Sequence, residues 1–373
     1  MNKIQVKEKR VEQIELFYDL IYVYAISRLT LLVEDGGVTF SKFGSYFVSC
    51  FVILQAWLYL TNYVNRYGRW QWYEYLLTAI NMIGAVYMSN TISPKWAEMS
   101  LTFNLAMLVM LLCVWLMYFI QLLLKEQDTG AAKNSLLILA VDCLLYFAAF
   151  LASASHAAGA VVWIDIAAVL LGAFLPFFIR GNFDIKVISF PHLAERFELL
   201  TIVTFGESVV GMTGYFDVKH FSLRPVLVFT IILLLFACYM LQLHEMCNHQ
   251  RQARALLLMF SHYLIVISVN LVTVGFHFLE NPEVNQTFTA VLMAVALLLF
   301  YISIYANSAY YYDRYSFTWR DAVLSALALL LGSGMIFLAG KNIYLFLCGA
   351  LLAVAGNFCL LYNKYKDGQK VQN

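Results

Sequence analysis

Apolar runs of about 20 residues, the length a helix needs to cross a bilayer, alternate with short polar segments along this chain. The connecting segments, such as "KEQDTG" and "ENPEVNQ", leave no room for a separate soluble domain. The chain is therefore predicted to be an all-α polytopic membrane protein. Its twelve expected transmembrane helices are 14–33, 44–64, 76–93, 101–124, 134–153, 161–179, 192–214, 225–245, 255–279, 287–308, 321–340 and 343–362.

Composition supports a membrane protein and excludes a soluble one. Hydrophobic residues make up 62% of the 373 residues and charged residues only 13%, against about 25% charged residues in an ordinary soluble domain. The first apolar run carries charges and no small-residue cleavage site follows it, so it is interpreted as a retained span, not a signal peptide. The net charge of +1 gives no reason to expect a nucleic-acid partner.

The basic residues predict the orientation of the chain. Of the 24 Lys and Arg residues, two lie within spans and 17 fall on the side of the N-terminus, which leaves five on the other side. The five are Lys42, Lys95, Lys219, Arg224 and Lys341. Because cytoplasmic segments are enriched in basic residues, both termini are expected in the cytoplasm.

Two segments, one near the start and one near the middle of the chain, also resemble each other in sequence. "EQIELFYDL" at 12–20 aligns with "ERFELLTIV" at 195–203, and six predicted spans separate the two copies. An even number of spans gives both copies the same direction. This predicts two parallel six-helix halves, 1–183 and 184–373, around a pseudo-two-fold axis along the membrane normal, as in some transporters.

The seventh span, 192–214, contains ionisable residues that are costly in hydrocarbon unless they are paired or hydrated. At 100° per residue, His192, Arg196 and Glu207 share one stripe of the helix, while Glu195 lies on its flank. Glu207 is too deep to reach the interface with its own side chain, so it requires a partner or a water-filled cavity.

The first span carries a matching polar face. Glu15 and Asp19 are four residues apart, with Tyr22 beside them, and Arg28 lies on the opposite side from Asp19. We expect the polar faces of the first and seventh spans to meet in one buried seam, with Arg196 close to a carboxylate. The seam is interpreted as a substrate or proton site. The alternative is an ion-pair network that only fixes helix register.

Other polar positions give weaker indications. His262 and Arg28 are secondary candidates, and His262 is interpreted mainly as a histidine bonded to a neighbouring helix. Asp142 and Asp165 are interpreted as interface charges near span ends. The seven cysteines form no CxxC pair, and the sequence contains no P-loop, GxSxG, HExxH or dinucleotide motif. We therefore expect no metal site and no cofactor.

Two segments, "IELFYDLIYVYAISRLT" (14–30) and "HLAERFELLTIVTFGES" (192–208), together resemble the bacterial low temperature requirement protein A family. The resemblance extends over nearly the whole chain, including "WLYLTNYVNR" (57–66) and "SHYLIVISVNLVTVGF" (261–276). It implies a multi-pass protein of the bacterial cytoplasmic membrane and a link to growth in the cold, but no known reaction or substrate. The family motifs fall on Glu15, Asp19, His192, Glu195, Arg196, Gly206 and Glu207. The chain departs from the family pattern at Arg28, at Glu198 and after "NRYGRW", which leaves the charge balance of the seam open.

Two classes of function remain open. A secondary transporter or permease for a small solute, with protons moving through buried carboxylates, is favoured by the span count, the repeat and the absent ATP motifs. A membrane-embedded enzyme or lipid-modifying protein would use His192 and Glu207 as acid and base, but no nucleophile or metal completes it. The expected partners are the lipid bilayer, a small-molecule or ion substrate and a second copy of the chain in a homo-oligomer.

Overall fold

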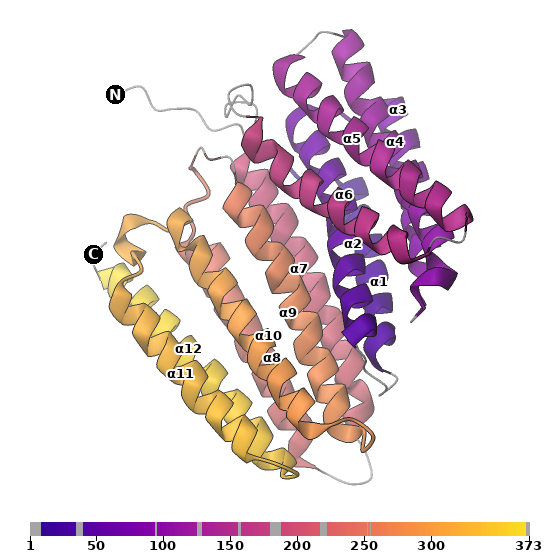
Figure 1. Ribbon diagram of the computed structural model, residues 1–373. Coiled ribbons are helices and arrows are strands. Elements are labelled where there is room, and N and C mark those ends of the chain that lie inside the picture. The colour runs from indigo at the N-terminus through magenta and orange to yellow at the C-terminus, as the bar shows by residue number, and fades with distance from the viewer. Residues whose placement is uncertain are drawn as a thin grey trace. The chain divides into compact units, whose positions relative to one another are not determined.

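The computed structural model describes residues 9–34, 40–93, 95–124, 129–155, 158–179, 188–216, 222–251, 253 and 255–370. The described residues form helices and no strand, apart from an isolated antiparallel bridge between Cys247 and Tyr311. The long helices, in chain order (Figure 1), are α1 Gln13–Glu34, α2 Phe40–Tyr67, α3 Trp72–Asn90, α4 Trp96–Leu124, α5 Thr129–Ala154, α6 Ala158–Phe178, α7 Phe190–Met212, α8 Leu223–Met240, α9 Leu256–Glu280, α10 Gln286–Ala306, α11 Trp319–Leu338 and α12 Ile343–Lys370.

Each predicted span overlaps one of these helices. Within the described part of the chain, nine helices are long and apolar enough to cross a membrane, and α1, α3 and α7 are not among them. Charged residues lower the hydropathy of α1 and α7, which contain Glu15, Asp19 and Arg196. The protein is thus an all-helical, multi-pass membrane protein, whereas the count of twelve crossings stays a prediction.

The chain divides into two compact units. Unit 1 comprises Met1–Arg196 with Gln252–Arg254, and unit 2 comprises Phe197–Arg251 with Ala255–Asn373. Helix α7 therefore begins in unit 1 and ends in unit 2. The predicted boundary between residues 183 and 184 lies outside the described residues, and the internal repeat stays a prediction.

Unit 1 is built around helix α4, which packs against α3 and α5, while α1 packs against α2 and α3. Phe103, Met107, Met110 and Val114 recur every three or four residues on α4 and are buried. Leucines on the other sides of the helix, such as Leu112, remain exposed. A helix with a buried apolar face and an exposed apolar face is typical of the bilayer, where lipid covers the second face.

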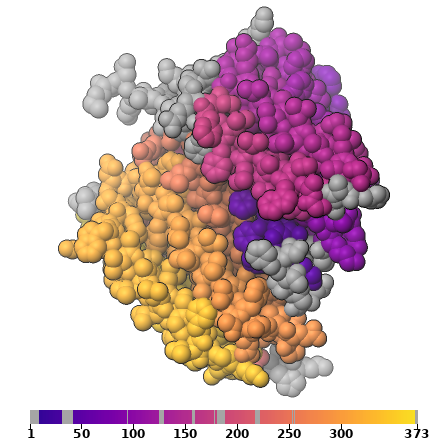
Figure 2. All heavy atoms as spheres, in the orientation of Figure 1, coloured from indigo at the N-terminus to yellow at the C-terminus, as the bar shows by residue number. Residues whose placement is uncertain are grey.

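In unit 2, α9 packs against α10 and is buried over most of its length, and α12 packs against α8 and α11. Gly332 of α11 and Gly349 of α12 lie against each other's backbone, so the two helices approach closely. In Figure 1 they run side by side, and in Figure 2 their side chains form a continuous surface of the unit.

Candidate functional site

Arg196 is the centre of a buried polar cluster in unit 1. Its guanidinium binds both acidic residues of the polar face of α1. Nη2 and Nε donate to the two carboxylate oxygens of Asp19 over 2.5 and 3.1 Å, and Nη1 donates to Glu15. The three side chains are each about 1% exposed or less at the residue level, so water does not solvate their charges. Paired charges of this kind persist in a low-dielectric interior because each is hydrogen-bonded to the other.

Helix α2 supplies the remaining contacts of Arg196 and Asp19. The Trp57 indole Nε1 donates to Asp19 over 2.7 Å, and the Arg196 guanidinium lies over the Trp57 ring, 5.5 Å from its centroid. Thr61, one turn further along α2, has its hydroxyl oxygen 3.5 Å from Arg196 Nη2. The guanidinium is therefore held by hydrogen bonds in its plane and by an aromatic ring on its face.

His192 joins the cluster one turn before Arg196 on α7. Its Nε2 lies 3.0 Å from a carboxylate oxygen of Glu15, and its Nδ1 lies 3.0 Å from the Asn65 amide nitrogen. Asn65 accepts from the Ser189 backbone N–H with its oxygen and donates to the Ser189 carbonyl with its nitrogen. This fixes the amide orientation, so His192 Nδ1 must accept and the imidazole proton sits on Nε2, facing Glu15.

The cluster carries a surplus of negative charge. Two carboxylates face one guanidinium, so with a neutral His192 these four side chains carry a net charge of −1. The Lys9 ammonium lies nearby and is held by the carbonyl oxygens of Val64 and Gly68 at the end of α2. Lys9 offsets the remaining negative charge from outside the four side chains. A buried carboxylate pair that shares one guanidinium is the type of arrangement that takes up a proton or a cation.

The structure thus brings together Glu15, Asp19, His192 and Arg196, four of the residues that the sequence placed in the seam. Tyr22 lies on α1 but points elsewhere, because its hydroxyl donates to Asn81 on α3 over 3.1 Å. Glu195 is exposed on the flank of α7.

Glu207 and Arg28 lie apart from this cluster. Glu207 is half-buried in unit 2, and its carboxylate has no hydrogen bond or ion pair with a described residue. It follows Arg196 by eleven residues, or about 16 Å along the axis of α7. Arg28 Nε is buried without a hydrogen-bond partner in the described part of the chain. Neither residue therefore contributes a contact to the cluster.

His262 is buried in unit 2. Its Nδ1 lies 2.7 Å from the Leu258 carbonyl oxygen and its Nε2 lies 3.1 Å from the Tyr239 hydroxyl on α8. Both ring nitrogens are occupied, which confirms the interpretation of a histidine bonded to a neighbouring helix.

Sequence reasoning missed the contribution of α2 to the cluster. Trp57, Thr61 and Asn65 follow one another at intervals of four residues and so share one face of α2. That spacing is visible in "WLYLTNYVNR" and could have indicated a third polar helix beside the other two. The interpretation of Asp142 and Asp165 as interface charges was wrong, since both side chains are completely buried between helices.

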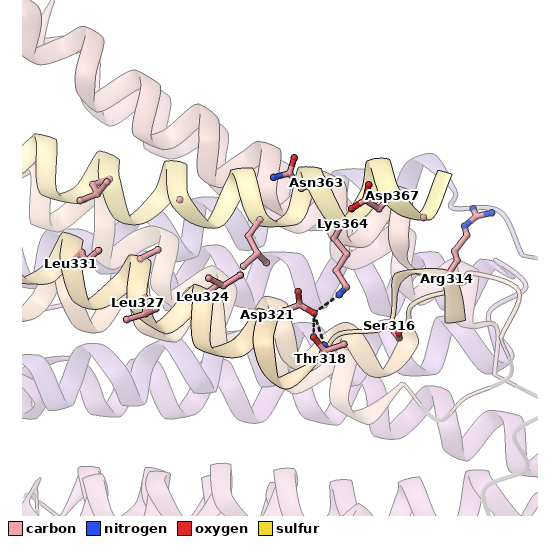
Figure 3. A pocket seen from close by; sticks show the side chains of 15 residues that line it. Arg314, Ser316, Thr318, Asp321, Leu324, Leu327, Leu331, Asn363, Lys364 and Asp367 are labelled. Atoms are coloured by element: carbon pink, nitrogen blue, oxygen red, sulfur yellow. Dashed lines mark hydrogen bonds and ion pairs between the residues drawn. The ribbon is translucent and has the colours of Figure 1, made fainter. Parts of the chain in front are cut away.

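A groove of about 770 Å³ lies between α11 and α12 of unit 2 (Figure 3). Leu324, Leu327 and Leu331 form its apolar wall. At its polar end Asp321 accepts hydrogen bonds from Thr318 and forms an ion pair with Lys364. None of the candidate residues predicted from the sequence lines this groove. The buried cluster of unit 1 is therefore the better candidate site.

Comparison with known proteins gives one clear relationship. The family model described as "Bacterial low temperature requirement A protein (LtrA)" matches residues 10–356, which include the whole Arg196 cluster. No curated protein and no solved structure matches the chain. Because the match covers most of the 373 residues, this chain belongs to the bacterial low temperature requirement A protein (LtrA) family.

Proposed function

We propose that this protein is a secondary transporter or permease that moves a small solute across the bacterial cytoplasmic membrane together with protons. The observation that supports it is the charge of the Arg196 cluster, in which two buried carboxylates face one guanidinium. Ionisable groups inside membrane proteins are expensive and characteristically belong to ion or proton pathways.

The hydrogen bonds around His192 favour a carboxylate as the group that takes up the proton. A proton on His192 Nδ1 would face the donor nitrogen of Asn65, and turning the Asn65 amide would break both of its hydrogen bonds to Ser189. A proton on Glu15 or on Asp19 breaks neither of these hydrogen bonds. Such a proton removes the net negative charge of the four side chains and weakens the ion pair between that carboxylate and Arg196.

Glu207 is the second proton-binding group in this proposal. Its carboxylate is half-buried on the same helix as Arg196 and is bound to no described side chain, so protonation costs it no ion pair. A transporter requires such a group to load and release protons.

Helix geometry disfavours the enzymatic alternative, because His192 and Glu207 are fifteen residues apart, about 22 Å along α7, and cannot act as acid and base on the same reacting atoms.

The test uses the purified full chain in liposomes that contain a pH-sensitive dye. Amino acids, sugars, nucleosides and short organic acids are added outside in turn, and internal pH is recorded with empty liposomes as the control. At least one solute class should acidify the lumen, and an inward pH gradient should accelerate its uptake. Uptake of a solute without any proton movement would contradict proton coupling. Absence of uptake for every class would contradict a permease.

A further inference from the structure

A second buried polar cluster lies in unit 1, around Asp142 of α5. Asp142 is completely buried, and no Lys, Arg or His side chain forms an ion pair with it within the described part of the chain. Its neighbours are Tyr59 and Gln55 of α2. The Tyr59 hydroxyl donates to Asp142 Oδ2, and Gln55 Nε2 lies 3.4 Å from the same oxygen and 2.9 Å from the Tyr59 oxygen. A buried carboxylate with only neutral neighbours must either take up a proton or be balanced by a positive charge from elsewhere.

Two acceptor oxygens of this cluster have no donor. Asp142 Oδ1 and Gln55 Oε1 are both buried, and neither has a hydrogen-bond partner among the described residues. A proton on Asp142 would neutralise the carboxylate and donate one hydrogen bond. A metal cation accepts lone pairs from several oxygens at once and supplies the missing positive charge. Two unsatisfied oxygens beside a buried carboxylate are thus what a bound cation would require, and a proton is the alternative that the experiment must distinguish.

Helix α6 provides space for this cluster and a further oxygen. Gly172 packs directly against Gln55, Tyr59 and Asp142, and a Cβ atom at this position would collide with all three polar groups. Four residues later α6 contains Pro176, which has no N–H to donate to the Gly172 carbonyl. A proline thus removes a backbone hydrogen bond at the residue that the polar atoms contact. Carbonyls released in this way bind Na⁺ in interrupted membrane helices.

We propose that Asp142, Gln55, Tyr59 and the Gly172 carbonyl bind a sodium ion. All four groups offer oxygen, the ligand that hard cations prefer. Turning the Gln55 amide toward the ion exchanges the two contacts of its Nε2, with Tyr59 and Asp142, for coordination by Oε1. One carboxylate balances one positive charge, so a monovalent ion leaves the buried site neutral, whereas a divalent ion leaves it charged. The site shares no residue with the Arg196 cluster.

This site is a property of unit 1 that can be tested without a transported solute. A role for Na⁺ as a coupling ion rests on the proposed permease function, but binding does not. Sodium binding by a protein that moves no solute in liposomes would refute the permease and support the sodium site. Solute flux by a protein that binds no sodium would refute the sodium site and support the permease.

The experiment measures binding of radioactive ²²Na⁺ and thermal unfolding of the full chain in detergent, with choline replacing sodium at constant ionic strength. Sodium should bind saturably and raise the melting temperature, because a ligand of the folded state stabilises it. Asp142→Asn should abolish both effects. Tyr59→Phe removes one oxygen and should weaken sodium binding by about tenfold or more. If Asp142→Asn does not fold, this second variant tests the site in its place.

Asp165 provides the matched control. It is also completely buried, on α6, and two oxygens there, Asp165 Oδ1 and Asn104 Oδ1, likewise have no donor among the described residues. It differs from Asp142 in that its carboxylate is contacted by Asn104 Nδ2 over 3.5 Å and, among the described residues, by no hydroxyl group. Asp165→Asn should leave the sodium response unchanged. The proposal would be overturned if the wild type bound no ²²Na⁺, or if its melting temperature responded to pH but not to sodium. It would also be overturned if Asp165→Asn lost sodium binding while Asp142→Asn kept it.

Discussion

Replacing Arg196 by methionine would leave Glu15 and Asp19 buried without the guanidinium that binds both. Three charge-assisted hydrogen bonds are lost, two to Asp19 and one to Glu15, and methionine fills much of the space without replacing them. Removing one partner of a buried ion pair destabilises a protein by about 3–5 kcal/mol, because the other charges stay desolvated. We expect a loss of that size in the apparent free energy of unfolding, measured by titration from mild detergent into dodecyl sulfate.

Two further variants separate the effect of charge from the effect of shape. Combining Arg196→Met with Glu15→Gln and Asp19→Asn removes all three charges, and most of the stability should return, since neutral replacements of a buried ion pair are often tolerated. Arg28→Met is the matched control on α1. Its Nε has no hydrogen-bond partner among the described residues, so a change below about 1 kcal/mol is expected. An Arg196→Met protein as stable as the control would refute the electrostatic account of the cluster.

Three other predictions concern the cluster, the helix packing and the topology. Trp57→Phe should cost about 1–3 kcal/mol in the same titration, because the carboxylate of Asp19 loses a 2.7 Å hydrogen bond; no change would mean that the indole only fills space. Gly332→Ala should lower the melting temperature, since its Cβ would lie 2.5 Å from the Gly349 carbonyl oxygen, whereas Gly334→Ala, with open space around it, should not; equal effects would argue against close packing of α11 and α12. Reporter fusions should place Gly37 outside and a tag after Lys370 inside, and an inside signal at Gly37 would contradict the orientation derived from the basic residues.

Much of the fold could be predicted because it depends on the local pattern of apolar residues. A run such as 101–124 can only be a helix in a bilayer, and the structure has α4 there. The start of α7 could also be predicted, because Ser189 comes directly before the helix and Pro191 falls in its first turn. The polar faces of α1 and α7 could be predicted for the same reason, since residues four apart share a face.

The partners of those faces could not be predicted, because they depend on which helices pack together. Asn65 is distant in sequence from Ser189, and nothing local indicates that its amide fixes the start of α7. The burial of Asp142 depends in the same way on α2 and α6, whose Gly172 provides the room. Glu207 shows that sharing a helix face with Arg196 does not predict a contact with it. It shares a stripe with Arg196, but the carboxylates of α1 are the groups that bind the guanidinium.

The most direct test of the central claim compares proton-linked flux of wild type, Asp19→Asn and Glu207→Gln in liposomes. Both replacements keep the size of the side chain and remove the exchangeable proton. We expect folded variants that no longer acidify the lumen when the solute is added, and a double variant little worse than either single one, since groups acting as a unit are not additive. Folded variants with wild-type flux and unchanged pH dependence would reduce the Arg196 cluster to an ion-pair network that only fixes helix register.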